Sequence, residues 1–181
     1  MLKNGNTVRI TGGELSGQKI KTPGGNTHPM GERERIALFN MLGDAVRGNA
    51  VMDLFCGGLT LGIEAVSRGA FFTLGLDDDP EAVEIANENM RHLGLFGYHG
   101  GAMVADVPLV ARTVTDKYGI VIADPPYDEY NEKMLRHLPR LVLDGGIFVL
   151  SHPGEAPEIK GLVLEKTRQY AGAHISIYRK K

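Results

Sequence analysis

Short apolar runs alternate with helix-like segments along most of this 181-residue chain, and that alternation limits the fold more than any other feature. Residues 50–54 and 71–76 form apolar runs of strand length, and each is followed by a stretch with apolar residues at helical spacing. Strands that alternate with helices are typical of an α/β fold with a parallel, doubly wound sheet. Ligands of such sheets bind at the carboxyl ends of the strands, so the chemistry is expected there.

The pattern extends over the rest of the sequence. We expect a mostly parallel seven-stranded sheet, with strands at 50–54, 71–76, 102–104, 119–122, 146–150, 162–165 and 174–178, the last two as a closing antiparallel pair. Helices are expected from residue 32, at 61–67, from Pro80, at 107–114 and at about 130–138. Alternating runs on either side of Gly12-Gly13 predict a small N-terminal β-hairpin. We therefore expect a hairpin extension over residues 1–30 and a main domain over 31–181.

The composition is that of an ordinary globular protein, with 43% hydrophobic and 23% charged residues. No apolar run approaches the roughly 20 residues of a membrane span, and the first residues do not begin a signal peptide, so we expect a cytoplasmic protein. The single cysteine, Cys56, excludes an internal disulfide and a multi-cysteine zinc site, and no metal is expected. The net charge of −2 argues against nucleic-acid binding over the whole surface, although basic residues gather near both termini.

The strongest chemical motif is Asp124-Pro125-Pro126-Tyr127, which follows the apolar run at residues 119–122. Two prolines prevent further strand pairing and an immediate helix, so the chain must turn there. The turn would display groups that suit a planar base with an exocyclic amino group. Tyr127 can stack on the base, while the Asp124 carboxylate and the Pro125 carbonyl accept the two amino protons. The alternative interpretation is a strand-ending turn with a solvated acid.

Further candidate residues fall at the ends of the other expected strands. They are Asp53, Phe55, Gly57 and Gly58 in a glycine-rich turn after the first strand, Asp77 and Asp79 after the second, and Asp106 after the third. Glycines let a backbone approach a ligand closely, and free N–H groups at a helix start attract negative charge. Carboxylates after the later strands can bind ribose hydroxyls or an adenine amino group. Each acid could instead cap a helix.

The order of these motifs resembles the Class I S-adenosylmethionine-dependent methyltransferases. More narrowly, it resembles the RsmD family, bacterial enzymes that methylate the guanine N2 amino group in 16S ribosomal RNA. The matching stretches are, in chain order, Arg9-Ile10-Thr11-Gly12-Gly13, Arg33 with Ala37-Leu38-Phe39-Asn40, the turn after Asp53 with Glu64-Ala65 and Ser67-Arg68-Gly69-Ala70, Asp124 to Tyr127, and the final strand ending at Tyr178.

The resemblance implies a Rossmann-like methyltransferase domain that uses S-adenosylmethionine as cofactor and ribosomal RNA or the small ribosomal subunit as partner, and we expect a monomer. By the family pattern, the cofactor's methionine part would face Asp53, Gly57 and Gly58, its ribose Asp77 and its adenine Asp106, with the target base at Asp124 to Tyr127. The basic hairpin with Arg9, Lys19 and Lys21 and the helix with Arg33 and Arg35 are the expected phosphate-binding surfaces.

The chain departs from the family pattern at two places. Leu59 stands where the family usually has glycine, and His28-Pro29-Met30 where it usually has Arg-Pro-Thr. If position 59 requires a left-handed backbone, leucine costs about 1 to 2 kcal/mol there, unless Gly58 adopts that conformation instead. Cys56 is expected to be a small packed residue rather than a nucleophile, because no base accompanies it in the turn.

Three alternatives remain open at this point. One is an amino methyltransferase that acts on DNA adenine or on a protein glutamine, since each can use a similar proline-rich turn. A nicotinamide-dependent oxidoreductase is disfavoured, because the turn lacks a complete Gly-x-Gly-x-x-Gly sequence. The third is a degenerate homologue that binds RNA without methylating it.

Overall fold

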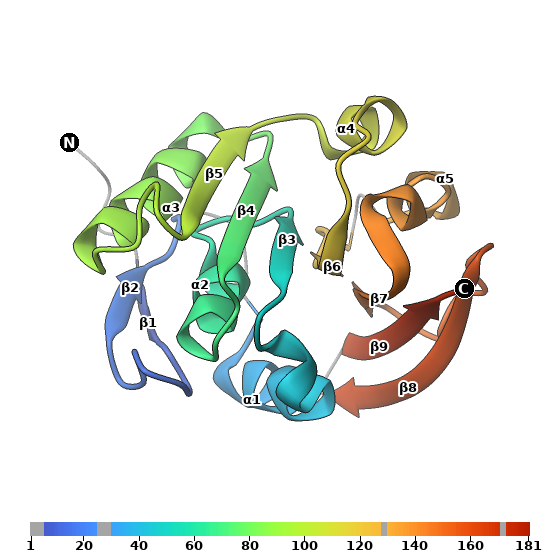
Figure 1. Ribbon diagram of the computed structural model, residues 1–181, viewed down its shortest axis with the longest axis horizontal. Coiled ribbons are helices and arrows are strands. Elements are labelled where there is room, and N and C mark those ends of the chain that lie inside the picture. The colour runs from blue at the N-terminus through green and yellow to red at the C-terminus, as the bar shows by residue number, and fades with distance from the viewer. Residues whose placement is uncertain (1–5, 25–29, 128–129, 171–172) are drawn as a thin grey trace.

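The structure, a computed structural model, describes residues 6–24, 30–127, 130–170 and 173–181. The departures at His28 and Pro29 lie outside these ranges. The main sheet contains β3 (Ala50–Leu54), β4 (Phe72–Asp77), β5 (Gly100–Val104), β6 (Tyr118–Ala123), β7 (Val142–His152), β8 (Leu162–Tyr170) and β9 (Ala173–Lys180). The strand order is β5-β4-β3-β6-β7-β9-β8 (Figure 1). Neighbours from β5 to β7 are parallel, and β9 is antiparallel to β7 and β8, which confirms the expected seven-stranded α/β fold.

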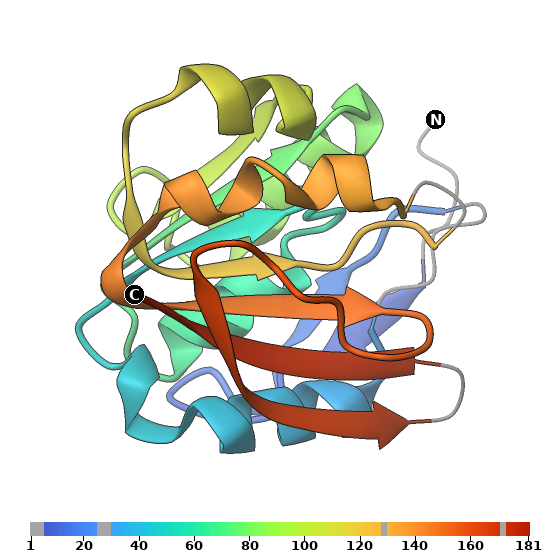
Figure 2. The same ribbon diagram turned by 90° about the vertical axis from the view of Figure 1, so that its right-hand side faces the viewer.

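Helices cover both faces of this sheet (Figures 1 and 2). They are α1 (Glu32–Leu42), α2 (Thr60–Ser67), α3 (Pro80–His92), α4 (Val107–Thr113) and α5 (Glu132–Leu135), with short 3-10 turns η1 (Gly43–Val46) and η2 (Leu138–Leu141). On one face, α4, α5 and η2 pack against a core that includes Met52 and Val121. On the other face, α1 and α2 pack against Val51 and Ile122. Successive residues of the central strands are therefore buried on opposite faces, which is why these strands are continuous apolar runs.

Two elements differ in length from the sequence expectation. The helix expected over about residues 130–138 ends early: α5 has four residues, and the 3-10 turn η2 follows it with Pro139 near its start. A proline removes a backbone donor and restricts the residue before it, so an α-helix does not continue through that point. Strand β8 is longer than expected and pairs with β9 as far as Tyr170. Most of its residues are exposed on both faces at the edge of the sheet, so it lacks the alternation that marks a half-buried strand.

The N-terminal hairpin consists of β1 (Thr7–Arg9) and β2 (Lys19–Lys21) and forms its own two-stranded sheet, as expected. Two isoleucines of the hairpin, Ile10 just after β1 and Ile20 in the middle of β2, are each 2% exposed. They belong to a core cluster that also contains Leu59 and residues of α2 and α3. The hairpin is therefore packed against the main sheet's helical layer through apolar side chains.

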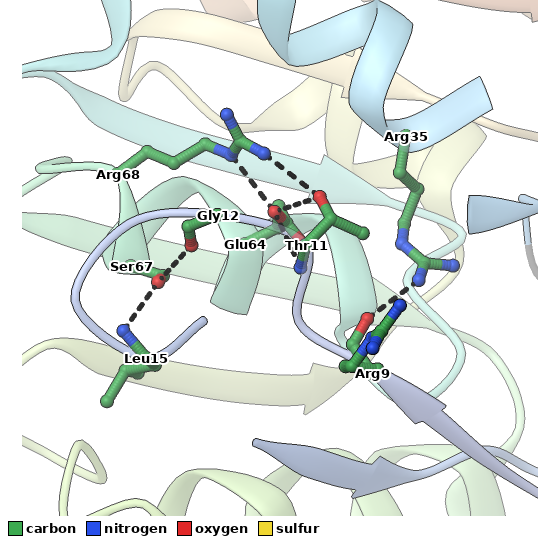
Figure 3. A network of polar contacts seen from close by, with 8 residues as sticks. All are labelled: Arg9, Thr11, Gly12, Leu15, Arg35, Glu64, Ser67 and Arg68. Atoms are coloured by element: carbon green, nitrogen blue, oxygen red, sulfur yellow. Dashed lines mark hydrogen bonds and ion pairs between the residues drawn. The ribbon is translucent and has the colours of Figure 1, made fainter. Parts of the chain in front are cut away.

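A buried carboxylate fastens the hairpin to α2 (Figure 3). Glu64, 0% exposed, accepts hydrogen bonds from Thr11 N and from Thr11 Oγ1 at 2.5 Å. Arg68 donates from Nε to Glu64 at 2.9 Å and from Nη2 to Thr11 Oγ1 at 2.9 Å. One turn away, Ser67 Oγ donates to Gly12 O at 2.6 Å. Thr11 and Gly12 of the hairpin are thus joined by polar contacts to Glu64, Ser67 and Arg68, at α2 and its end.

A buried amide makes a second connection between the hairpin and the main domain. Asn89 of α3 is 2% exposed and accepts a hydrogen bond from Lys21 N at 2.9 Å. Its Nδ2 donates to Lys21 O at 2.9 Å and to Gly58 O at 3.0 Å. One side chain therefore joins the end of β2 to the glycine-rich turn that follows β3.

Candidate active site

The carboxyl ends of four parallel strands lie next to one another in the sheet. Leu54 of β3 pairs with Leu76 of β4 and with Ala123 of β6, and Ala123 pairs with Leu150 of β7. The residues that follow these four positions emerge at the same edge of the sheet. They are Phe55, Asp77, Asp124 and Ser151.

Three of the acids named from the sequence interact electrostatically at this edge. Asp53 is 2% exposed and accepts a hydrogen bond from Gly62 N at 2.9 Å. Burial raises the pKa of Asp53 well above its ordinary value, the hydrogen bond from Gly62 opposes this, and the charges of Asp124 and Asp77 raise it further. Burial also raises the pKa of Asp124. Burial and mutual repulsion disfavour ionisation of these acids, and a positively charged ligand would offset both effects, because a nearby positive charge stabilises ionised carboxylates.

The turn after β3 contains three residues in the left-handed backbone region. They are Phe55, Gly57 and Leu59, with φ angles of 60°, 50° and 62°. Asp77 holds this turn, because its carboxylate accepts a hydrogen bond from Gly57 N at 2.8 Å. The same carboxylate accepts a second hydrogen bond from Asp79 N, after β4, at 3.0 Å. The sequence analysis predicts a cofactor-binding role for Asp77, and the structure shows its carboxylate bound to the main chain of the turn.

Position 59 does adopt the left-handed conformation, and Gly58 does not adopt it instead. The Leu59 side chain is 0% exposed and belongs to the core cluster under the hairpin. Glycine at position 58 is required for another reason: a Cβ atom there would lie 2.8 Å from Lys21 O of the hairpin. The turn is thus closed over by the hairpin backbone, with leucine packed beneath it.

Asp79 and Asp106 both cap helices, which is the alternative raised for them from the sequence. Asp79 accepts a hydrogen bond from Glu81 N at 2.9 Å at the start of α3, and Asp106 accepts one from Leu109 N at 2.7 Å at the start of α4. Asp106 also lines a cavity of about 360 Å³. The other lining residues are Phe55, Asp78, Ala105, Val107, Pro108, Asn131 and Met134. This volume lies in the range of small-molecule sites.

The Asp124 turn ends β6, as expected. Pro125 is buried and Pro126 is exposed, while Tyr127 is 40% exposed. The Tyr127 hydroxyl lies 3.0 Å from Ser151 Oγ, and a hydrogen bond from Ser151 lowers the pKa of Asp124 against the larger effect of burial. Ser151 was not among the residues named from the sequence, because no motif marks it and only strand pairing brings it here.

The basic residues of the hairpin lie on the surface. Arg9, Lys19 and Lys21 are exposed, and Arg9 forms an ion pair with Glu32 at 2.7 Å. Lys21 Nζ lies 3.0 Å from Glu88 of α3. A cavity of about 420 Å³ lies between the hairpin and the start of α1, and its lining residues include Arg9, Lys19 and Glu32.

The two arginines expected on the α1 surface differ in burial. Arg33 is exposed, whereas Arg35 is 1% exposed. Arg35 donates hydrogen bonds to Met30 O at 2.7 Å and to Arg9 O at 2.9 Å. The expectation that Arg35 belongs to an exposed phosphate-binding surface is therefore corrected: its guanidinium binds main-chain carbonyls between the hairpin and α1.

Within residues 6–24, 30–127, 130–170 and 173–181, no group of three or more His, Cys, Asp or Glu side chains is arranged to hold a metal ion. In the same part of the chain, no helix is long and apolar enough to cross a bilayer.

Comparison with known proteins places the chain among methyltransferases. The family model described as conserved hypothetical protein 95 matches residues 8–179. The Bacillus subtilis protein named putative rRNA methyltransferase YlbH is 31% identical over 185 residues, covering 96% of this chain and 100% of that protein. Ribosomal RNA small subunit methyltransferase D of Escherichia coli is 30% identical over 124 residues, covering 66% of this chain and 60% of that protein.

Solved structures agree with the observed fold. A structure described as putative methyltransferase yhhF from Escherichia coli superposes with a TM-score of 0.87 at 22% identity, covering 97% of this chain and 99% of that one. The magnesium protoporphyrin IX methyltransferase from Synechocystis, solved with bound SAM, superposes with a TM-score of 0.67 at 18% identity, covering 82% and 79% of the two chains.

The edge formed by the four strands fits S-adenosylmethionine chemically. The interacting carboxylates of Asp53, Asp77 and Asp124 suit its positive charges, and the cavity beside Asp106 has the size of a small-molecule site. With a family match over nearly the whole length, the chain belongs to the conserved hypothetical protein 95 family and is an RsmD-like, S-adenosylmethionine-dependent methyltransferase.

Proposed function

We propose that this enzyme methylates an exocyclic amino group of a nucleobase, namely guanine N2 in 16S ribosomal RNA. The names of its relatives support a ribosomal RNA substrate. The observation that carries the proposal is the Asp124 turn, in which a carboxylate stands beside a 40% exposed tyrosine ring at the edge where the site's acids converge. A ring and an adjacent acceptor match a planar base that carries an amino group.

The cofactor's parts can be assigned to the chain's residues. S-adenosylmethionine supplies a methyl group on a positively charged sulfonium, which is a good leaving group. We assign its methionine part to Asp53, Gly57 and Gly58, its ribose to Asp77 with Asp79 beside it, and its adenine to the cavity lined by Phe55 and Asp106. The carboxylates stabilise positive charge at this edge, and the hydrogen bonds that Asp77 accepts from Gly57 N and Asp79 N keep the main chain on both sides of it in place.

At the target base, the chain's residues act by alignment and charge. In our proposal, Asp124 and the Pro125 carbonyl accept hydrogen bonds from the two amino N–H groups, which makes the nitrogen lone pair available for attack. As the nitrogen gains the methyl group, one of its two protons is released, and Asp124 is placed to take it. Tyr127 stacks on a base that has left its helix or comes from a loop. Pro126 with Pro125 fixes the backbone of the turn. Groups already oriented toward the developing charge lower the barrier without a covalent intermediate.

RNA would approach over the hairpin and the start of α1. We propose that Arg9, Lys19, Lys21 and Arg33 contact phosphates, and that the partner is ribosomal RNA or the small ribosomal subunit, bound by a monomer. Exposed lysines and arginines supply the sequence-independent part of such binding. Because Arg9 and Lys21 form ion pairs with carboxylates, RNA would have to compete with Glu32 and Glu88 for them.

The direct test is methyl transfer from tritiated cofactor to unmodified small subunits, comparing wild type with Asp124→Asn and Tyr127→Ala. Asp124→Asn should lower turnover by about a hundredfold to a thousandfold, because it removes one preorganised electrostatic partner. Tyr127→Ala should weaken capture of the base by roughly 1 to 3 kcal/mol, the value of a stacking platform.

Two substitutions of similar chemistry serve as controls. Asp44→Asn and Tyr98→Ala change strongly exposed residues and should leave transfer unchanged. Equal turnover for wild type and Asp124→Asn would reject the turn as the catalytic site. Separating RNA from protein after the reaction locates the label: label in ribosomal protein, or transfer to DNA alone, would replace the RNA substrate by one of the alternatives.

A further inference from the structure

Strand pairing places Ser151 beside the Asp124 turn. Leu150 of β7 pairs with Ala123 of the parallel β6, so the next residues, Ser151 within β7 and Asp124 just after β6, lie side by side. Ser151 is 3% exposed, and its Oγ lies 3.0 Å from the Tyr127 hydroxyl. The buried Ser151 hydroxyl thus contacts Tyr127, and Ser151 lies next to Asp124, the other residue of the proposed base site.

The number of available protons fixes the direction of these hydrogen bonds. A serine hydroxyl has one proton, and an ionised carboxylate can only accept. Ser151 Oγ lies 3.0 Å from the Tyr127 hydroxyl, and Ser151 stands beside Asp124, whose pKa a hydrogen bond from Ser151 lowers. When Asp124 is ionised, Ser151 must donate to it, and the Tyr127 hydroxyl must then donate to Ser151. The result is a chain that runs from Tyr127 to Ser151 to Asp124.

The surrounding charges act on both ends of this chain. Beyond the effect of burial, the charges of Asp124 and Asp77 raise the pKa of Asp53 of β3, and the charges of Asp124 and of Glu34 on α1 raise the pKa of Tyr127. Asp53, Asp77 and Glu34 are acids, so none of them donates a proton that could replace that of Ser151 when they are ionised. The Ser151 hydroxyl, unlike these acids, is a neutral group that can donate to an ionised Asp124 carboxylate.

We propose that Ser151 is a positioning residue that fixes the Tyr127 ring and the Asp124 carboxylate relative to each other through this ordered chain. The proposal rests on the proposed function and deepens it. The two prolines restrict only the backbone of the turn, and a 40% exposed tyrosine ring could otherwise turn about its side-chain bonds. A fixed position of the Tyr127 hydroxyl would keep the Tyr127 ring at a constant angle to the Asp124 carboxylate.

The test is a double-mutant cycle with Ser151→Ala and Tyr127→Phe, assayed by methyl transfer at saturating cofactor. Each single variant breaks the same hydrogen bond, so the double variant should be no slower than Ser151→Ala within about twofold. Ser151→Ala should lower kcat by about tenfold to a hundredfold, because it also removes a hydrogen bond to a charged group. Ser151→Thr keeps the hydroxyl and should restore most of the rate. Effects that multiply in the double variant would overturn the proposal.

A second readout uses the protein without cofactor or RNA. Carboxyl NMR with labelled aspartate, assigned with Asp124→Asn, follows the titration of Asp124. The hydrogen bond from Ser151 lowers the pKa of Asp124, so Ser151→Ala should raise it, and the acid limb of the kcat profile should move to higher pH. Ser176→Ala is the matched control, because Ser176 is a buried serine on β9 that bonds His152 and Thr167 instead of the turn.

The outcomes separate the two proposals. An unchanged Asp124 titration in Ser151→Ala, or an equal shift in Ser176→Ala, overturns the role of Ser151 even in an enzyme that methylates RNA. A shift seen only in Ser151→Ala, in a wild type that methylates no RNA, supports the hydrogen-bond chain and rejects the proposed function. If Ser151→Ala fails to fold, Tyr127→Phe and Ser151→Thr decide: a Tyr127→Phe variant as fast as wild type overturns the positioning role.

Discussion

Leu59 fills the space that a side chain at position 75 would need: a Cβ atom on Gly75 would lie 2.5 Å from Leu59 Cδ1. A Cβ atom on Gly62 of α2 would likewise lie too close to Leu59, at 2.8 Å from the same Cδ1 atom. The leucine in the cofactor turn is therefore accommodated by glycines on both neighbouring elements. A residue that departs from the family pattern has become a core residue.

We expect Leu59→Gly to lower the free energy of unfolding. The change removes a fully buried side chain, which costs about 2 to 5 kcal/mol, and relieves left-handed strain of about 1 to 2 kcal/mol. Urea unfolding followed by circular dichroism measures the difference. Leu59→Ala is the control: it loses most of the side chain but keeps the strain, so it should be less stable than Leu59→Gly by about 1 kcal/mol. A glycine variant as stable as wild type would contradict the packing role.

Asp77→Ala should weaken S-adenosylmethionine binding. The substitution removes the acceptor that holds Gly57 N and Asp79 N, together with the proposed ribose ligand. Loss of a hydrogen bond to a charged group is worth roughly 1.5 to 3 kcal/mol, which corresponds to about tenfold to 150-fold in Kd. Titration calorimetry gives the Kd directly, with the exposed Asp44→Ala as reference. A Kd equal to that of wild type would show that Asp77 does not contribute to cofactor binding.

Glu64→Gln should destabilise the fold far more than Glu32→Gln. Glu64 is 0% exposed and pairs with Arg68 at 2.9 Å, whereas Glu32 and its partner Arg9 are both on the surface. Removing one partner of a buried ion pair costs about 3 to 5 kcal/mol, because the remaining charge loses its counter-charge. Exposed pairs contribute little. Chemical denaturation of both variants provides the comparison, and similar losses would show that the buried network does not fasten the hairpin.

His152 should make stability depend on pH. The residue is buried, its Nε2 lies 2.8 Å from Ser176 Oγ, and its ring stacks on His174 at 5.6 Å. Burial lowers the pKa of His152, the hydrogen bond to Pro153 opposes this, and His174 lowers it further. The folded state therefore binds a proton less readily than the unfolded chain. The stability that neutral His152 contributes is complete above about pH 6.5, the pKa of histidine in the unfolded chain. It is lost as the pH falls below that value.

The measurement is the unfolding free energy of wild type and His152→Gln between about pH 5 and pH 8, the range in which histidine titrates. Wild type should lose stability toward the acid end, and His152→Gln should lose less. His92→Gln, a change at an exposed position on α3, should follow the wild-type curve. An identical acid slope in His152→Gln and wild type would assign the loss to other groups.

The sequence predicted the central sheet well, because β3 and β6 are buried on both faces and stand out as apolar runs bounded by turn residues. The edge strand β8 was predicted too short, since residues exposed on both faces give no periodic signal. Asp53, Asp77 and Asp124 could be placed together for a geometric reason: parallel strands end at one edge, so acids that follow them meet there.

Two features of the site depend on contacts that no local pattern records. Ser151 ends an apolar run in an ordinary way, and only the pairing of the preceding residue, Leu150, with Ala123 brings it to Tyr127. Arg35 has the same composition around it as the exposed Arg33, yet its burial is decided by carbonyl groups of a segment that precedes α1. Pairing register and main-chain acceptors are set by the tertiary fold, which a single sequence expresses only indirectly.

The amide of Asn89 binds Lys21 in the hairpin and Gly58 in the cofactor turn, so neither segment can shift without breaking a buried hydrogen bond. A ligand that stiffens one of these segments therefore reduces the ordering cost of binding at the other. By linkage, RNA on the hairpin and cofactor in the turn must raise each other's affinity by the same factor if the bridge transmits this stiffening. The enzyme would then hold its methyl donor most tightly when a substrate is already in place.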